Sequence, residues 1–307
     1  MTTSGHGQTA GSAGGEHAER FTHLRPLLFT IVYEILGSAT ESDDVLQDSY
    51  LRWAEVDLTS VRDTKSYLAK VVARQALNAL RANVRRREDY VGPWLPEPLL
   101  LDEHDPAADV VLAESVSTAM LVVLETLSPD ERAVFVLREV FGFDYDDIGS
   151  AVSRPTATVR QISHRAREHV QSRRRRFEPV NEALAVRVTT DFLAAAASGD
   201  VEQLMATLAP DVVWTADSNG KASAARRPVL GAEKVAKLVM GVVRAAGSLG
   251  RIEPAVYNSA PALVLHLGDH VVCVITIEIT DGRIANLYAM RNPDKLAAAS
   301  VQRAISR

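Results

Sequence analysis

The chain has 307 residues, of which 47% are hydrophobic and 24% charged, with a formal net charge of −5. This composition is that of an ordinary globular protein, excludes a wholly disordered or fibrous chain, and at this length predicts about two domains. The single cysteine, Cys273, excludes an intramolecular disulfide framework and a cysteine-rich zinc site. We expect no membrane segment, because no apolar run approaches the roughly 18 residues that span a bilayer.

Residues 1–19 are rich in Gly, Ser, Thr and Ala and carry no apolar stretch. They predict a disordered tail and no signal peptide, so we expect a cytoplasmic protein. Residues 20–88 predict helices with a short break at 57–64. Residues 89–110 lack helical periodicity and contain several prolines, which indicates a linker before a second helical domain at 111–177.

The pattern changes after residue 180. Two helices are predicted, and short alternating apolar runs predict strands at 212–215, 262–267, 271–279 and 283–290. Gly268-Asp269 and Asp281-Gly282 predict hairpin turns between the last three strands. Together these elements predict a separate α+β domain over 181–291, followed by a tail over 292–307.

Charge is distributed unevenly along the two helical regions. Residues 65–87 hold seven bases and no acid, 88–147 hold fifteen acids against two bases, and 154–176 hold eight arginines and one acid. Two basic segments around an acidic one indicate two nucleic-acid contacts with a repelled segment between them. The alternative, for each run by itself, is a solvated helix face.

Within the first basic segment, five polar side chains share one side of a helix, opposite the apolar positions. They are Lys70, Arg74, Asn78, Arg81 and Arg85. A one-sided cationic stripe without acids suits a phosphate backbone, because each neutralised phosphate releases counterions. The stripe therefore predicts nucleic-acid contact.

The segment from Leu127 to Arg167 has the pattern of helix, tight turn and helix. Ser128 and Glu131 predict a capping box, and a turn at 153–155 separates a short helix from one starting near Thr156. The last helix carries polar and basic side chains toward its N-terminal end: Thr156, Arg160, Gln161, His164, Arg165 and Arg167. A helix-turn-helix presents its recognition helix to the major groove in this way.

An acidic-polar face with one leucine lies on the helix predicted over 41–56. Its residues are Asp44, Gln47, Asp48 and Leu51, at spacings of one helical face. This face suggests docking on a basic protein partner. A solvated helix with Leu51 half-buried fits the pattern equally well.

These motifs resemble those of sigma-70 factors of the extracytoplasmic-function (ECF) type over residues 20–177. The string from Glu41 to Trp53 is similar to their core-polymerase-binding segment, and Leu127–Arg167 is similar to their −35-reading domain. The resemblance implies core RNA polymerase, through its β′ clamp and β flap, and promoter DNA as partners. It assigns the Asp44–Leu51 face to the clamp, the Lys70–Arg85 stripe to the −10 element and the Thr156–Arg167 side chains to the −35 element.

Three further strings resemble the ECF subgroup whose sigma domains are fused to a SnoaL-like domain of the NTF2-like fold. They are Trp94-Leu95-Pro96-Glu97-Pro98, Asp217-Ser218-Asn219-Gly220-Lys221 and Asn292-Pro293-Asp294-Lys295-Leu296. The second departs from the usual Asp-Gly-Gly-Gly-Lys/Arg, because Ser218 and Asn219 replace two glycines. The appended domain resembles a built-in regulator, which implies an intramolecular contact with the sigma domains.

Trp94 has no helix of its own to bury its ring in this proline-rich linker. We expect it to seek a pocket in the C-terminal domain. The alternative is that it packs back onto the first helical domain.

The fold class is thus two all-α sigma domains followed by an α+β NTF2-like domain, with no enzymatic activity, cofactor or metal site expected. The alternative is an NTF2-like ligand-binding protein or isomerase- or cyclase-type enzyme that carries a helix-turn-helix, with a small molecule in the cone of the C-terminal domain. Residues that would supply such chemistry are Trp214, Asp217, Tyr257, His266 and Tyr288. Asp217 is expected to be solvated, in a polar loop. The promoter sequence, the inducing signal, the oligomeric state and the sign of regulation stay open.

Overall fold

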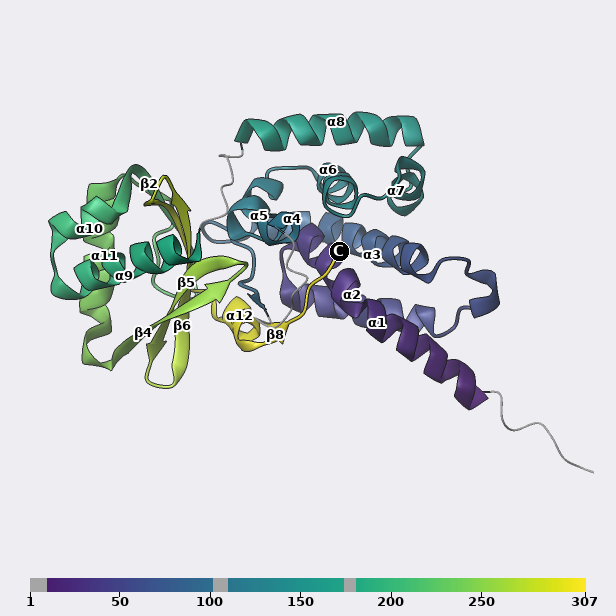
Figure 1. Cartoon of the computed structure of the whole chain (residues 1–307), viewed down its shortest axis with the longest axis horizontal. Helices are drawn as coiled ribbons and strands as arrows, with labels where there is room; N and C mark the ends of the chain where they lie inside the picture. Colours follow the sequence, from purple (N-terminus) through teal and green to yellow (C-terminus); the bar gives the residue numbers. More distant parts are fainter. Residues whose placement is uncertain (1–9, 102–109, 174–180) are drawn as a thin grey trace, which may run out of the picture.

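The computed structural model describes residues 10–101, 110–173 and 181–307, apart from the side chains of 10–14, 84–88 and 182. Two helical regions pack against each other, and an α+β domain lies at one end of them (Figure 1). The chain after this domain runs back over the first helices, so that its last residues lie beside α1 and α2.

The first helical region consists of α1 (Ala10–Leu36), α2 (Ala39–Trp53) and α3 (Thr64–Glu88). Because α1 begins at Ala10, the predicted disordered tail is wrong for residues 10–19, while 1–9 lie outside the described residues. The physical reason is a tertiary contact: the Trp53 indole N–H donates to the carbonyl of His17 at 2.9 Å, and the two rings meet edge to face. Packing of this kind stabilises a helix that composition alone does not predict.

The second helical region is built from short helices: α4 (Val110–Ser115), α5 (Thr118–Leu124), α6 (Pro129–Phe135), a π-helical turn (Val136–Val140), α7 (Tyr145–Val152) and α8 (Thr156–Arg173). The predicted capping box is confirmed at the start of α6, where the Ser128 and Glu131 side chains each bond the other's backbone. The predicted turn before α8 is also present, and Ser153 adopts a left-handed conformation there.

Both helical regions contribute to one hydrophobic core. Leu28 and Val72 from the first region lie in the same buried cluster as Leu121 and Val159 from the second, and each is fully buried. Apolar surface removed from water stabilises such a contact by roughly 25 cal/mol per Å². The two regions therefore form one packed helical body in this structure.

The C-terminal domain has a six-stranded sheet in the order β3-β2-β7-β6-β5-β4. Its helices are α9 (Glu182–Ser198), α10 (Val201–Thr207) and α11 (Ala232–Ala246), and its strands are β2 (Leu208–Asp217), β3 (Val229–Leu230), β4 (Gly250–Tyr257), β5 (Ala260–Leu267), β6 (His270–Thr280) and β7 (Arg283–Met290). Strands β2 and β7 are parallel and the other pairs are antiparallel. The α+β prediction is confirmed, as are the turns at Gly268 and at Asp281-Gly282, where the backbone is left-handed.

The two faces of this sheet pack against different parts of the chain. One face packs on the domain's own helices, in a cluster that contains Phe192, Trp214 and Val235. The other face carries Tyr257 and Tyr288 and packs against the linker and the chain after β7. The sheet therefore joins the domain to the rest of the molecule as well as forming its core.

After β7 the chain forms α12 (Pro293–Leu296) and a 3₁₀ turn (Ala297–Ser300). Strand β8 (Gln302–Arg303) then pairs in parallel with β1 (Leu100–Leu101) of the linker. Among the described residues, no helix has the length and apolar character needed to cross a membrane.

Candidate functional site

The linker segment 94–98 lies at the centre of the molecule, between the helical body and the C-terminal domain. The deeply buried anchor is Leu95, at 2% exposure, within the cluster on the sheet face that carries Tyr257 and Tyr288. Trp94 is only half-buried. Its ring touches Gly37 of the α1–α2 turn, where a side-chain Cβ would lie 2.8 Å from it, and Lys295 lies 3.9 Å from the ring centroid. The ring thus contacts the first helical region, which was the alternative expectation, and Lys295 of the segment that follows the C-terminal domain.

Glu97 attaches the linker to the first turn of α2. Its carboxylate accepts hydrogen bonds from the hydroxyl of Ser38 at 2.8 Å and from the backbone N–H of Thr40 at 3.0 Å. Its own N–H donates to the carbonyl of Gly37 at 2.9 Å. A buried carboxylate needs such donors, and here they come from the N-cap and first turn of α2.

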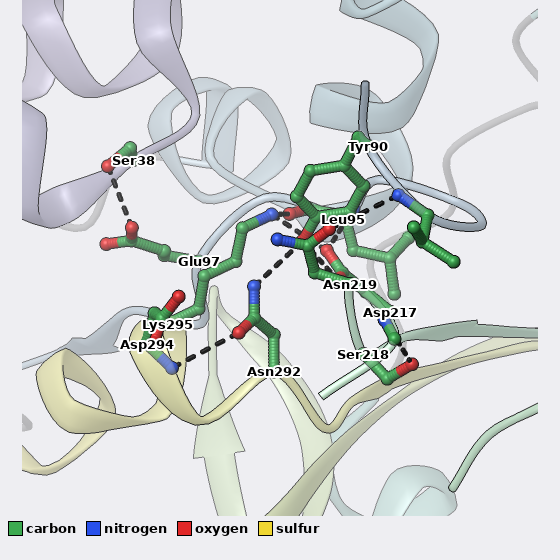
Figure 2. A network of polar contacts seen from close by, with 12 residues as sticks. Ser38, Tyr90, Leu95, Glu97, Asp217, Ser218, Asn219, Asn292, Asp294 and Lys295 are labelled. Carbon is green, nitrogen blue, oxygen red and sulfur yellow. Dashed lines mark hydrogen bonds and ion pairs between the residues drawn. The ribbon is translucent and has the colours of Figure 1, made fainter. Parts of the chain in front are cut away.

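Asp217, at the end of β2, is fully buried and holds three segments together (Figure 2). Its carboxylate accepts from the hydroxyl of Tyr90 at 2.5 Å, the backbone N–H of Leu95 at 2.8 Å and the ammonium of Lys295 at 2.7 Å. The expectation that Asp217 is solvated is therefore wrong. Its partners lie far away in the sequence, so a local pattern of turn residues could not reveal its burial.

Lys295 and Tyr90 complete this buried cluster. The Lys295 ammonium also donates to the carbonyl of Leu95 at 2.6 Å, and the side-chain amide of Asn292 donates to the Tyr90 hydroxyl at 2.9 Å. Burial and the hydrogen bond to Asp217 raise the pKa of Tyr90, so its hydroxyl keeps the proton that it donates.

The loop after β2 also contacts the linker. Asn219 and Gly220 have left-handed backbones, a conformation that Asn tolerates better than most residues. The Asn219 side chain accepts from the N–H of Val91 at 3.2 Å, and Lys221 forms an exposed ion pair with Asp294. Ser218 has no left-handed backbone, so both replacements of the usual glycines fit the loop. The three strings that resemble the subgroup's motifs thus form one network.

Asn258 is a buried contact that the sequence analysis missed. Its side-chain oxygen accepts from the N–H of Leu99 at 2.8 Å, and its amide donates to the hydroxyl of Tyr33 and the carbonyl of Val116. It therefore joins α1, the linker and the α4–α5 connection to the β4–β5 turn. The available signal was the dipeptide Asn258-Ser259 between two runs, since two left-handed residues make a tight hairpin turn.

A second missed cluster joins α1 to the second helical region. Glu34 is fully buried, accepts from the hydroxyl of Ser115 at 2.6 Å, and receives the Arg132 guanidinium on its backbone carbonyl at 2.9 Å. Burial raises the pKa of Glu34 to about 8, although Ser115 and Arg132 oppose the shift. Arg132 in turn pairs with Glu125.

The acidic-polar face of α2 is open to solvent. Asp44, Gln47, Asp48 and Leu51 are all exposed, and Leu51 has 59% exposure. The alternative of a half-buried Leu51 is not what the structure has. Beside this face, Asp43 pairs with Arg25 and with Arg303 of β8.

The basic stripe of α3 faces the second helical region. Lys70 pairs with Asp147 at 2.5 Å, Arg74 donates to the carbonyl of Ser150 at 2.6 Å, and Arg81 pairs with Asp130 at 2.5 Å. These partners lie on α7 and at the start of α6. Asn78 is exposed, and the side chain of Arg85 lies outside the described residues.

Helix α8 buries Val159 and Ile162 and leaves most of its predicted contact residues on the surface. Those exposed are Arg160, Gln161, His164 and Arg165. Two others have partners within the second helical region: Arg167 donates to Glu139, and the Thr156 hydroxyl donates to Asp146, both at 2.6 Å.

The residues considered for an enzyme do not converge on one pocket. Trp214 lies in the cluster beneath the helices, whereas Tyr257 and Tyr288 lie in the cluster on the opposite face of the sheet. His266 lies 3.1 Å from Glu253 of the neighbouring strand, and Asp217 is occupied by the linker. Within the described part of the chain, no group of three or more metal-ligating side chains comes together.

Comparison with known proteins places this geometry in a family. The family model for sigma-70 region 2 matches residues 20–86, and that for sigma-70 region 4 matches residues 117–170. The ECF RNA polymerase sigma factor SigJ of Mycobacterium tuberculosis is 33% identical over 293 residues, which cover 92% of this chain and 94% of SigJ. The probable sigma factor SigI of the same organism is 26% identical over 89% of this chain and 92% of its own.

A solved structure agrees with these sequence matches. The crystal structure of M. tuberculosis SigJ has a TM-score of 0.73 to this chain at 31% identity, covering 92% of this chain and 99% of that one. The match extends through both helical regions and the α+β domain, so the expected resemblance is confirmed. The chain belongs to the family of ECF sigma-70 RNA polymerase sigma factors.

Proposed function

We propose that this sigma factor binds core RNA polymerase through the exposed face of α2 and promoter DNA through α3 and α8, and that its C-terminal domain restrains it in a closed form. In detail, Asp44, Gln47, Asp48 and Leu51 contact the β′ clamp, and the second helical region contacts the β flap. The stripe on α3 meets the −10 element and α8 meets the −35 element. No bond is made or broken by the protein in this role.

The observation that carries the closed form is the cover over the α3 stripe. Lys70, Arg74 and Arg81 all hold partners on α6 or α7, so a DNA backbone has to displace these contacts. The −10 and −35 elements are numbered about 25 base pairs apart, which is roughly 85 Å at 3.4 Å per base pair. Helices α3 and α8 both pack against α6 and α7, far closer than that, so this form cannot engage both elements.

The C-terminal domain supplies the restraint from outside the helical body. Asp217 and Asn258 hold the linker and the helices through buried hydrogen bonds. The last residues add a second attachment, because Ile305 is buried in the helical core and Arg303 pairs with Asp43 beside the polymerase-binding face. Activation then consists of separating the two helical regions, so the C-terminal domain acts as an inhibitor of this sigma factor.

The test loosens the cover without changing the DNA-facing side chains. Asp147→Asn and Asp130→Asn remove the acids that pair with Lys70 and Arg81, and Asp144→Asn is the matched control, since Asp144 is a 90% exposed acid in the same region. The readout is promoter-dependent transcript from core polymerase and the full chain. We expect more transcript from the first two variants and no change from the control. Equal transcript from all three contradicts the closed form, and absence of core binding contradicts the sigma role.

A further inference from the structure

A cavity of about 430 Å³ lies where the two helical regions meet. It is lined by Arg81 from α3, by residues 128–131 at the start of α6, by Arg154 of the turn, and by one face of α8 that includes Arg165. Ligand pockets in proteins begin at roughly 300 Å³, so its size suits a small molecule. The first helical region contributes Arg81 to the lining, so separating the two regions removes this side chain from the site.

The charges that line this cavity are not balanced. Arg81 and Arg154 share a single acid, Asp130, at 2.5 and 2.9 Å. Glu131 is turned toward Ser128 by the capping box, with its oxygen 2.7 Å from that hydroxyl. Arg165 is exposed and, within the described part of the chain, forms no hydrogen bond or ion pair. Three guanidinium groups and two carboxylates therefore line the cavity. Asp130 already pairs with two of the arginines, and Glu131 is held by Ser128.

Donors remain free for a ligand. A guanidinium offers five N–H donors in a planar fork. Asp130 takes the Nη2 of Arg81 and the Nε and Nη2 of Arg154, which leaves further N–H groups on both. Phosphate groups are the ligands that suit several such forks, because they are multiply charged and accept bidentate hydrogen bonds.

We propose that this cavity binds a compact polyphosphate anion, free pyrophosphate or the diphosphate end of a nucleotide, between Arg81, Arg154 and Arg165. The occupied form is the closed form, since the ligand bridges both helical regions. Arg81 and Arg165 also belong to the DNA-contacting helices α3 and α8 of the proposed function. This inference therefore rests on that function for its regulatory meaning. The anion uses the donors that promoter DNA needs, so it competes with DNA and stabilises the closed form by mass action.

Binding is measured by isothermal titration calorimetry with the full chain and sodium pyrophosphate at constant ionic strength. Parallel titrations use sulfate and a nucleoside diphosphate. The sulfate titration compares a single dianion with a diphosphate. The nucleoside diphosphate titration compares a free diphosphate with one carried by a nucleotide. We expect saturable binding of both diphosphates and much weaker binding of sulfate. Arg165→Ala is expected to weaken the affinity about 10- to 100-fold, the effect of one charge-assisted hydrogen bond.

Arg187→Ala is the matched control, because Arg187 is an exposed arginine on α9 away from the cavity. Arg165→Ala breaks no ion pair of the described structure, and its thermal melting without ligand checks that it folds. Absence of saturable pyrophosphate binding at millimolar concentration, or equal affinity in the Arg165 and Arg187 variants, overturns the proposal. The measurement contains neither polymerase nor DNA, so its failure is distinct from failure of the sigma role.

Discussion

The substitution Asp217→Asn tests whether the buried carboxylate holds the linker. The Asp217 side chain has no exposure and that of Lys295 has 9%, and their charged atoms lie 2.7 Å apart. The amide keeps the shape of the carboxylate but replaces one accepting oxygen with a donor, so the Lys295 charge loses its counter-charge. Removing one partner of a buried pair costs about 3–5 kcal/mol, because the remaining charge stays buried.

That cost corresponds to a factor of roughly 100 to 4,000 in a folding or closing equilibrium, at about 1.4 kcal/mol per tenfold. The matched control is Lys221→Ala, which breaks the Lys221–Asp294 pair of the same network. Both of those side chains are about half exposed, at 48% and 59%, so the expected loss is at most about 1 kcal/mol.

Two assays follow the Asp217→Asn variant. Urea unfolding reports the free energy of unfolding, and hydrogen–deuterium exchange reports protection of the Leu95 N–H, which donates to Asp217. We expect faster exchange over residues 90–95 and more promoter-dependent transcript than from the Lys221 control. Adding Lys295→Met is expected to recover part of the lost stability, since no charge is then left unpaired. Unfolding free energies within about 0.5 kcal/mol for the Asp217 and Lys221 variants would refute the reasoning.

Three further predictions concern other parts of the structure. Burial raises the pKa of Glu34 from 4.5 to about 8, so its protonated form favours the folded state. This stabilisation is complete below pH 4.5 and is lost as the pH rises through about 8. Glu34→Gln should flatten that decline of the unfolding free energy in urea. Asn258→Gly keeps the left-handed turn but removes three buried hydrogen bonds, and should lower the free energy of unfolding by about 2–4 kcal/mol. Leu51→Glu should weaken core polymerase binding at least about tenfold, in a surface-immobilised binding assay, while the unfolding free energy stays within about 0.5 kcal/mol. An unchanged pH slope, an unchanged urea midpoint or unchanged polymerase binding would contradict each in turn.

Local patterns predicted the elements that depend on neighbouring residues. The capping box at Ser128 and the turn at Asp281-Gly282 follow from side chains a few positions apart. Strand β4 was not predicted, since its solvent-facing residues and Pro254 blur the alternation. The start of α1 was missed because its stability comes from the contact of His17 with Trp53.

The candidate site likewise has features that local patterns predict and features that only distant contacts determine. The sequence showed that the stripe on α3 is cationic and one-sided, but the acids opposite it lie on another helical region, so that only the fold reveals the cover over Lys70 and Arg81. The linker motif was recognisable in the sequence. Which of its side chains is deeply buried, Leu95 and not Trp94, depends on the sheet that faces it.

By itself the sequence determined which residue types recur at helical or strand spacing, and through them the family and the order of the domains. The tertiary structure decided which of these surfaces meet. Asp217 and Lys295 are 78 positions apart and become a buried pair only when the linker packs against both of them. Burial and electrostatic partners depend on such distant contacts, whereas helix caps, turns and amphipathic faces depend on residues within a few positions of each other.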